Sequence, residues 1–293
     1  MIVPDLTFIA SANAVALAGA TPVLVDVRRE DFGLEPELVR AAVTPRTKAI
    51  MPVHVNGRGA ALEEIVAIAE ALGLSIVEDA SEALGSSLAG RPLGSFGHAA
   101  AFSFAPTKII TTGQGGVVVT DDPELDRRIR ELKDQGRATR GTGGADAHPV
   151  FGFNFKLTNV HAAIGLAQLE RLPGRLARLR DLHAWYAEEL GGLDPAIRLL
   201  PVDRAGGEAI AWIDVLVERR DALVSHLKER RIDAREFWFP LHTQPPYAAE
   251  GFPSATWASA HGLWLPSALS LTRDDVAEVG RAIREFAAAP VLA

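Results

Sequence analysis

The chain has 293 residues, of which 48% are hydrophobic, and it carries a formal net charge of −7. This length suits about two domains, and the apolar content can fill a substantial core, so the composition indicates a globular protein. The net negative charge argues against nucleic-acid and anionic-membrane partners, which attract basic surfaces. The absence of cysteine excludes disulfides, thiolate metal sites and a thiol nucleophile.

No basic segment followed by an apolar core opens the chain, and no run of about 18 apolar residues occurs in it. These patterns argue against a secretory signal and a membrane span. We therefore expect a soluble cytoplasmic protein, and metal ligation is not expected.

The first part of the chain alternates short apolar runs with segments of helical periodicity. Residues 21–27, 47–53 and 75–78 are apolar and rich in β-branched side chains, whereas residues 35–43 and 60–72 have helical spacing. This alternation predicts right-handed crossovers and an α/β fold, with a mostly parallel central sheet flanked by helices on both faces.

Two further strands are predicted at residues 99–103 and 116–120, on either side of a loop that contains Lys108. Thr158 has the character of an N-cap and predicts a helix to about Leu169, followed by a second helix to about Leu190. The remainder alternates strand and helix again. We predict a large domain over residues 1–178 and a smaller C-terminal α+β domain over residues 179–293.

Asp79 directly follows the apolar run 75–78, so we expect it at the carboxyl edge of the sheet, where open α/β folds bind ligands. A carboxylate there can keep a pyridine nitrogen protonated and make the ring an electron sink. The alternative is that Asp79 caps a following helix, because aspartate is a favoured N-cap residue.

Lys108 follows the almost wholly apolar run 99–106, which predicts a partly desolvated lysine. Desolvation favours the neutral amine, which can attack an aldehyde and can then carry the proton of an amino donor.

Ser103 can donate to a phosphate or be an ordinary serine at a strand end. Phe8 can stack on a pyridine ring or belong to the core. The lysine, the aspartate and the serine together suit pyridoxal phosphate (PLP), whose aldehyde, ring nitrogen and phosphate need three such partners.

The joint pattern closely resembles the DegT/StrS family of PLP-dependent sugar-nucleotide aminotransferases, over nearly the whole chain. The resemblance is carried by the stretches IVPDLTFIASANAVALAGATPVLVDV, TKAIMPVHVNG, VEDASEALGSSLAGRPLGSFGHAAAFSFAPTKIITTGQGGVVVT and FGFNFKLTNVHAAIGLAQLERL. It implies the fold of a fold-type-I PLP-dependent transferase.

The resemblance also implies roles for individual residues. Lys108 matches the lysine that forms a Schiff base with PLP, and Asp79 matches the partner of the pyridinium nitrogen. Ser103 corresponds to a phosphate ligand. Phe8 falls where the family places an aromatic side chain on the cofactor, and Glu82 falls where a side chain approaches the ring hydroxyl.

Asn154 matches an asparagine that reaches the phosphate bound by the other subunit, which implies an obligate homodimer with shared active sites. The stretches EDASEALGS, KIITTGQGG and FWFPLHTQPPY look most like the perosamine-synthase branch. Members of that branch transfer the amino group of L-glutamate to C4 of a nucleotide-linked 4-keto-6-deoxy sugar. His242 would lie near the sugar nucleotide, or it could be structural.

The sequence departs from the family at Gln114, where glutamate is usual, and at Leu84, where many relatives have histidine.

Family members also carry several dozen residues before the strand that begins here at Ile2, including a helix N-terminus that anchors phosphate. Without that anchor we expect weaker cofactor binding, by a factor on the order of 10² to 10⁴. The alternative function is therefore a truncated or degenerate family member without catalysis, which would act as a binding or partner module or be a partial gene product.

Overall fold

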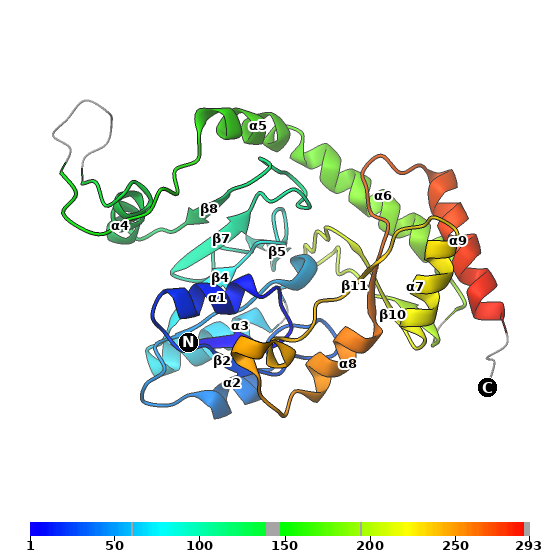
Figure 1. The fold of residues 1–293 in the computed structure, drawn as a ribbon, viewed down its shortest axis with the longest axis horizontal. Helices are drawn as coiled ribbons and strands as arrows, with labels where there is room; N and C mark the ends of the chain where they lie inside the picture. Colours follow the sequence, from blue (N-terminus) through cyan, green and yellow to red (C-terminus); the bar gives the residue numbers. More distant parts are fainter. Residues whose placement is uncertain (60, 139–146, 194, 290–293) are drawn as a thin grey trace.

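The structure is a computed structural model, and it describes residues 1–59, 61–138, 147–193 and 195–289. Figure 1 shows one group of elements around a six-stranded sheet and a second group around a four-stranded sheet. No helix in these described ranges is long and apolar enough to cross a bilayer.

The six-stranded sheet has the strand order β2-β1-β3-β4-β7-β8. Its strands are β1 (Ile2–Pro4), β2 (Val23–Val25), β3 (Ala49–Ile50), β4 (Ser75–Asp79), β7 (Ala99–Ser103) and β8 (Gly116–Val119). Neighbouring strands are parallel except for β8, which is antiparallel to β7. The predicted mostly parallel central sheet is therefore confirmed.

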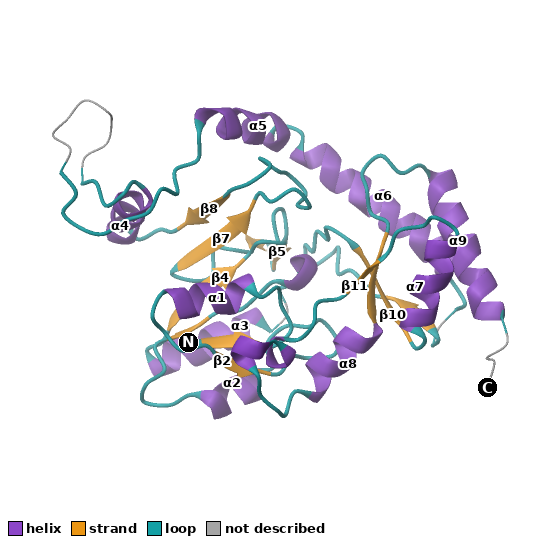
Figure 2. Cartoon of the chain, in the orientation of Figure 1, coloured by secondary structure: helices purple, strands orange, loops and turns teal. Residues whose placement is uncertain are grey.

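Helices cover both faces of this sheet, because successive side chains of a strand point to opposite sides. In β1, the side chain of Ile2 belongs to the same buried cluster as residues of α2 (Pro36–Ala42) and α3 (Leu62–Leu72). The next residue, Val3, belongs to a different cluster together with α1 (Ala10–Leu17). Figure 2 shows these helices in purple around the orange strands.

The second sheet is antiparallel and has the order β11-β12-β10-β9. Its strands are β9 (Ile197–Leu199), β10 (Ile213–Val217), β11 (Arg235–Glu236) and β12 (Gly262–Leu265). One large apolar cluster joins it to α6 (Leu172–Leu190), α7 (Arg220–Glu229) and α9 (Arg273–Ala288). The fold thus has the expected α+β C-terminal part. The predicted domain boundary after residue 178 falls inside α6, and it stays a prediction.

The remaining elements lie at the edges of the two sheets. They are α4 (Pro123–Lys133), α5 (Asn159–Leu169), α8 (Pro253–His261), the hairpin of β5 (Ser87–Leu88) and β6 (Arg91–Pro92), and the short 3₁₀-helices η1 (Val55–Gly57), η2 (Leu241–Thr243) and η3 (Pro245–Tyr247). Thr158 caps α5 as predicted, because its hydroxyl accepts the backbone N–H of His161 at 3.3 Å.

Buried polar contacts tie the two sheets together. The guanidinium of Arg58 donates to the carboxylate of Asp214 on β10 at 2.5 Å, and both side chains are almost wholly buried. The hydroxyl of Ser86 donates to the carbonyl of Ala209 at 3.1 Å, again from the first group of elements to the second. Since a buried charge is tolerated only when it is paired, these contacts hold the two sheets in one arrangement.

Glu78, at the end of β4, anchors the loop that leads into β7. Its fully buried carboxylate accepts the backbone N–H groups of Gly94, Phe96 and Gly97 at 2.6–2.8 Å and contacts His54 Nε2 at 2.9 Å. Burial alone would raise the pKa of Glu78, but the contact with His54 and the backbone N–H groups outweigh it, so the pKa lies below its ordinary value of 4.5.

We expect Glu78→Gln to lower the free energy of unfolding by about 3 kcal/mol at pH 7, because the N–H groups would lose a charged acceptor. A carboxyl group with a depressed pKa in the folded state stabilises the fold above its unfolded pKa, and this contribution is lost as pH falls through the folded value. The difference between parent and variant should therefore shrink below about pH 4.5 in urea titrations. Glu124→Gln on the exposed surface of α4 is the control and should change little; a pH-independent difference for Glu78→Gln would contradict the assignment.

Candidate active site

A cavity of about 970 Å³ lies between the carboxyl edge of the six-stranded sheet and the four-stranded sheet. Five of the residues singled out from the sequence line it, namely Phe8, Asp79, Glu82, Ser103 and Lys108. They come from three separate segments of the first sheet. Their convergence follows from the parallel arrangement, because the carboxyl ends of neighbouring strands meet at one edge.

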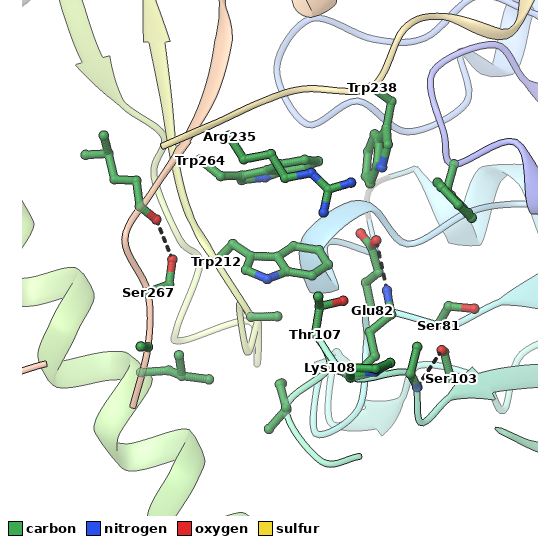
Figure 3. Close-up of a pocket in the computed structure, with 18 of the residues that line it drawn as sticks. Ser81, Glu82, Ser103, Thr107, Lys108, Trp212, Arg235, Trp238, Trp264 and Ser267 are labelled. Atoms are coloured by element: carbon green, nitrogen blue, oxygen red, sulfur yellow. Dashed lines mark hydrogen bonds and ion pairs between the residues drawn. The ribbon is translucent and has the colours of Figure 1, made fainter. Parts of the chain in front are cut away.

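Lys108 lies in the loop between β7 and β8, and its side chain is only 15% exposed. Its Nζ is 3.2 Å from Glu82 Oε1 and 4.9 Å from the ring centroid of Trp212 (Figure 3). The lysine is therefore largely desolvated, as the apolar run before it predicted. It is also held between a carboxylate and an indole face, an arrangement that the sequence did not reveal.

Glu82 is almost wholly buried beside Lys108. Its second carboxylate oxygen, Oε2, accepts the backbone N–H of Asn56 at 2.9 Å. Burial raises the pKa of Glu82 above its ordinary value, since the loss of solvation outweighs the opposing charge of Lys108 and the hydrogen bond from Asn56. The cavity thus contains a buried carboxyl group in direct contact with the amine of Lys108.

Asp79 is oriented by two hydrogen bonds. Its Oδ2 accepts the hydroxyl of Ser11 on α1 at 2.7 Å, and its Oδ1 accepts the backbone N–H of Ser81 at 3.1 Å. The alternative interpretation of Asp79 as a helix N-cap is wrong, because turns and no helix follow it in residues 80–86. The carboxylate is instead fixed at the strand end and lines the cavity.

Ser103 and Phe8 line the same cavity. The Ser103 oxygen accepts the backbone N–H of Ala105 at 3.2 Å, so its hydroxyl hydrogen can be donated to a ligand. The side chain of Phe8 is 54% exposed, so it does not belong to the core, which was the alternative interpretation. Its ring is free to stack on a planar ligand.

Asn154 and His242 are not among the cavity-lining residues of the described chain. Asn154 is exposed and forms a backbone bridge with Asp134. His242 Nδ1 is 2.6 Å from Asp5 Oδ2, and its ring stacks on Phe252 with centroids 5.0 Å apart. Within one chain, these two predicted site residues therefore lie apart from the other five.

The cavity is also lined by residues that the sequence analysis did not single out, among them Trp212, Trp238, Trp264 and Arg235. These four belong to the second sheet and its connections, more than 100 residues from Lys108 along the chain. Arg235 lies over the ring of Trp264, with 5.6 Å from its guanidinium carbon to the ring centroid. The concentration of tryptophan in the C-terminal half was the signal that could have found them, because buried indoles commonly form ligand-binding surfaces.

The fold and the cavity define a fold-type-I PLP-dependent transferase. The model of the DegT/DnrJ/EryC1/StrS aminotransferase family matches residues 1–284, and the chain belongs to this family. The class of enzyme is a sugar-nucleotide aminotransferase, as the sequence analysis predicted.

Relatives and solved structures agree with this assignment. The chain is 39% identical to GDP-perosamine synthase of Caulobacter vibrioides, over 95% of this chain and 76% of the relative. It is 36% identical to GDP-perosamine synthase of Escherichia coli O157:H7, over 98% of this chain and 78% of the relative. The structure of DesV from S. venezuelae in complex with a ketimine intermediate superposes with a TM-score of 0.91 at 38% identity, covering 99% of this chain and 78% of that chain. DesI in the presence of its TDP-sugar product gives a TM-score of 0.89 at 34% identity, covering 98% of this chain and 74% of that chain.

The family uses PLP, which confirms the predicted cofactor. The residues around the cavity fit this group. Lys108 supplies an amine for the aldehyde, Asp79 supplies an oriented carboxylate for the ring nitrogen, and the exposed ring of Phe8 supplies a stacking surface. Ser103 can donate a hydrogen bond to the phosphate.

We expect His242→Ala to lower the free energy of unfolding by about 3 kcal/mol, because the fully buried Asp5 would lose the imidazole that contacts its Oδ2 and keep only the backbone N–H of residue 242. His261→Ala is the matched control, since His261 stacks on Trp257 and contacts only a backbone carbonyl. Chemical denaturation of the two variants checks the difference. An unchanged stability with a raised KM for a sugar nucleotide would instead favour the substrate contact that the sequence suggested for His242.

Proposed function

We propose that this aminotransferase moves the amino group of L-glutamate to a nucleotide-linked 4-keto-6-deoxy sugar. The observation that carries the proposal is the convergence of Lys108, Asp79 and Glu82 in one cavity of about 970 Å³. The similarity to two GDP-perosamine synthases supports the sugar nucleotide as acceptor. A cavity of this volume accommodates a ligand larger than an amino acid alone.

Bound PLP would supply an electron sink for the electron pair left behind when an amino donor loses its α-proton. The residues of this chain would do the rest. Lys108 would bind the cofactor aldehyde through Nζ and, once released, accept the α-proton of the donor. Asp79 would hold the ring nitrogen in its protonated form, with Ser11 and Ser81 fixing the carboxylate. Glu82 would approach the ring hydroxyl, and Ser103 and Phe8 would hold the phosphate and the ring.

The test is an assay for 2-oxoglutarate with L-glutamate and a panel of GDP- and TDP-linked 4-keto-6-deoxy sugars. We expect turnover by the parent chain and a loss of at least about 10³-fold in Lys108→Ala, because no other lysine of the described residues lines the cavity. Lys228→Ala on α7 is the control and should retain full activity. Borohydride reduction of the PLP-loaded protein followed by peptide mapping should label Lys108 in the parent and in the control.

Labelling at another lysine, or equal turnover by Lys108→Ala and the parent, would contradict the assignment of Lys108. Turnover of the sugars with a different amino donor would overturn only the choice of glutamate. A family member without catalysis, the alternative function, predicts no turnover with any donor and sugar. The hydrogen-bonded and buried arrangement of Lys108, Glu82 and Asp79 favours the enzyme over this alternative.

We also propose that the chain forms a homodimer with shared active sites and acts in the cytoplasm. The segment 151–169 exposes large apolar side chains, among them Phe151 at 99%, Phe155 at 71% and Val160 at 70%. Helix α5, which lies in this segment, has no buried residue. Exposed apolar surface of this extent indicates an interface, and a second copy of the chain would cover it. Asn154 lies in the same segment, where it could reach the phosphate of the partner's cofactor.

Sedimentation velocity should show a dimer for the parent chain and a monomer for Val160→Asp, because a charge at the centre of an apolar interface is left unpaired. The control is Leu17→Asp, which changes an apolar side chain that is 89% exposed on α1. We expect this control to remain dimeric. A monomeric parent, or equal dissociation of both variants, would argue against the proposed interface.

A further inference from the structure

Asn56 lies at the junction of the two sheets, in the short 3₁₀-helix η1. It is fully buried and adopts a left-handed backbone conformation with φ 48°. Such a conformation is uncommon for a residue with a side chain, and asparagine is among the residues that tolerate it best. A buried, conformationally restricted amide therefore needs a specific set of partners.

The side chain of Asn56 binds the segment that carries Trp212. Its Oδ1 accepts the backbone N–H groups of Ala211 and Trp212 at 2.7 and 3.0 Å. Its Nδ2 donates to the carbonyl of Trp212 at 2.9 Å and to Asp214 Oδ2 at 2.6 Å. One amide therefore satisfies both polar backbone groups of Trp212 and fixes the position of that residue.

The backbone of Asn56 binds the other neighbour of Lys108, because its N–H donates to Glu82 Oε2. Figure 3 shows Glu82 and the ring of Trp212 near the Lys108 side chain. The amine contacts Glu82 Oε1 at 3.2 Å and lies 4.9 Å from the centroid of the Trp212 ring. Both groups that confine the amine are thus held by a single residue that does not itself line the cavity.

We propose that Asn56 is a positioning residue for Lys108, which it confines by fixing Glu82 through its backbone and Trp212 through its side chain. The importance of this role rests on the proposed function, in which Lys108 is the reacting amine. The carboxylate and the indole face both attract the ammonium form, so they hold Nζ at one place in the cavity. A displacement of a reacting group by about 1 Å can lower the reaction rate on the order of 10²-fold. Confinement of the Lys108 amine would therefore help to maintain the rate.

Ser86 provides a comparison, since it links the loop after β4 to the segment that precedes β10 and its hydroxyl bonds neither Glu82 nor Trp212. Its hydroxyl donates to the carbonyl of Ala209 at 3.1 Å and accepts the N–H of Ala209 at 3.0 Å. If Asn56 served only to join the two sheets, loss of its side chain and loss of the Ser86 hydroxyl would affect Lys108 alike.

The experiment measures the rate at which acetic anhydride acetylates each lysine of the 293-residue chain before PLP is added, by peptide mass spectrometry. Asn56→Gly is the informative variant, because glycine accepts the left-handed backbone and keeps the N–H that binds Glu82. We expect acetylation of Lys108 relative to Lys228 to rise about three- to tenfold in Asn56→Gly, since the loss of the indole contact frees the amine. Ser86→Ala should leave this ratio within about twofold of the parent.

A second variant tests the route through the indole ring. Trp212→Leu keeps the backbone groups that bind Asn56, so it should raise the Lys108 ratio by a similar factor even if Asn56→Gly fails to fold. The double variant Asn56→Gly, Trp212→Leu should show no further increase, because both changes remove the same contact.

An unchanged ratio in Asn56→Gly, equal increases in Asn56→Gly and Ser86→Ala, or an unchanged ratio in Trp212→Leu would each overturn the proposal. A double variant whose ratio is the product of the two single effects would do the same. None of these readouts depends on turnover. A failure of the proposed aminotransferase reaction would therefore leave the positioning result intact, and the two outcomes can be told apart.

Discussion

The buried contact between the Lys108 amine and the Glu82 carboxylate is the interaction on which the rest of the site depends. Removing two charged groups from water costs more than their attraction returns, unless further hydrogen bonds and packing compensate. Here the compensation comes from the N–H of Asn56 and the face of Trp212. The site therefore depends on loops of the first sheet and on Trp212, the residue that directly precedes strand β10 of the second sheet.

Each of the two sheets contributes a different set of residues to the cavity. The parallel sheet brings Asp79, Glu82 and the loop of Lys108 to one edge, because the carboxyl ends of parallel strands lie at the same edge of a sheet. The antiparallel sheet and its connections supply the opposite wall, which contains Trp212, Trp238 and Trp264. Buried contacts such as that of Arg58 with Asp214 fix one wall relative to the other. The surroundings of Lys108 thus depend on how the two sheets pack against each other.

Much of this arrangement could be predicted from local patterns. The alternation of apolar runs and helical segments was sufficient for the mostly parallel sheet, and the position of Asp79 after a strand was sufficient to place it at the ligand-binding edge. Local patterns could not choose between two roles that differ only in the surroundings of a residue in the folded chain. Asp79 caps no helix, because turns follow it in the chain. Phe8 is not in the core, because its side chain lines the cavity and is more than half exposed.

The sequence by itself determined the fold class and the family, and it singled out seven candidate site residues, of which five line the cavity. It could do so because hydrophobic periodicity and the lysine-containing motif are local properties of the chain. Only the tertiary structure decided that Glu82 pairs with Lys108, that Trp212 lies over the amine and that Asn56 holds both. These contacts join residues up to 156 positions apart, which is the separation between Trp212 and Asn56. The physical reason is that buried polar groups select their partners by position in the folded core, and a linear pattern does not contain that position.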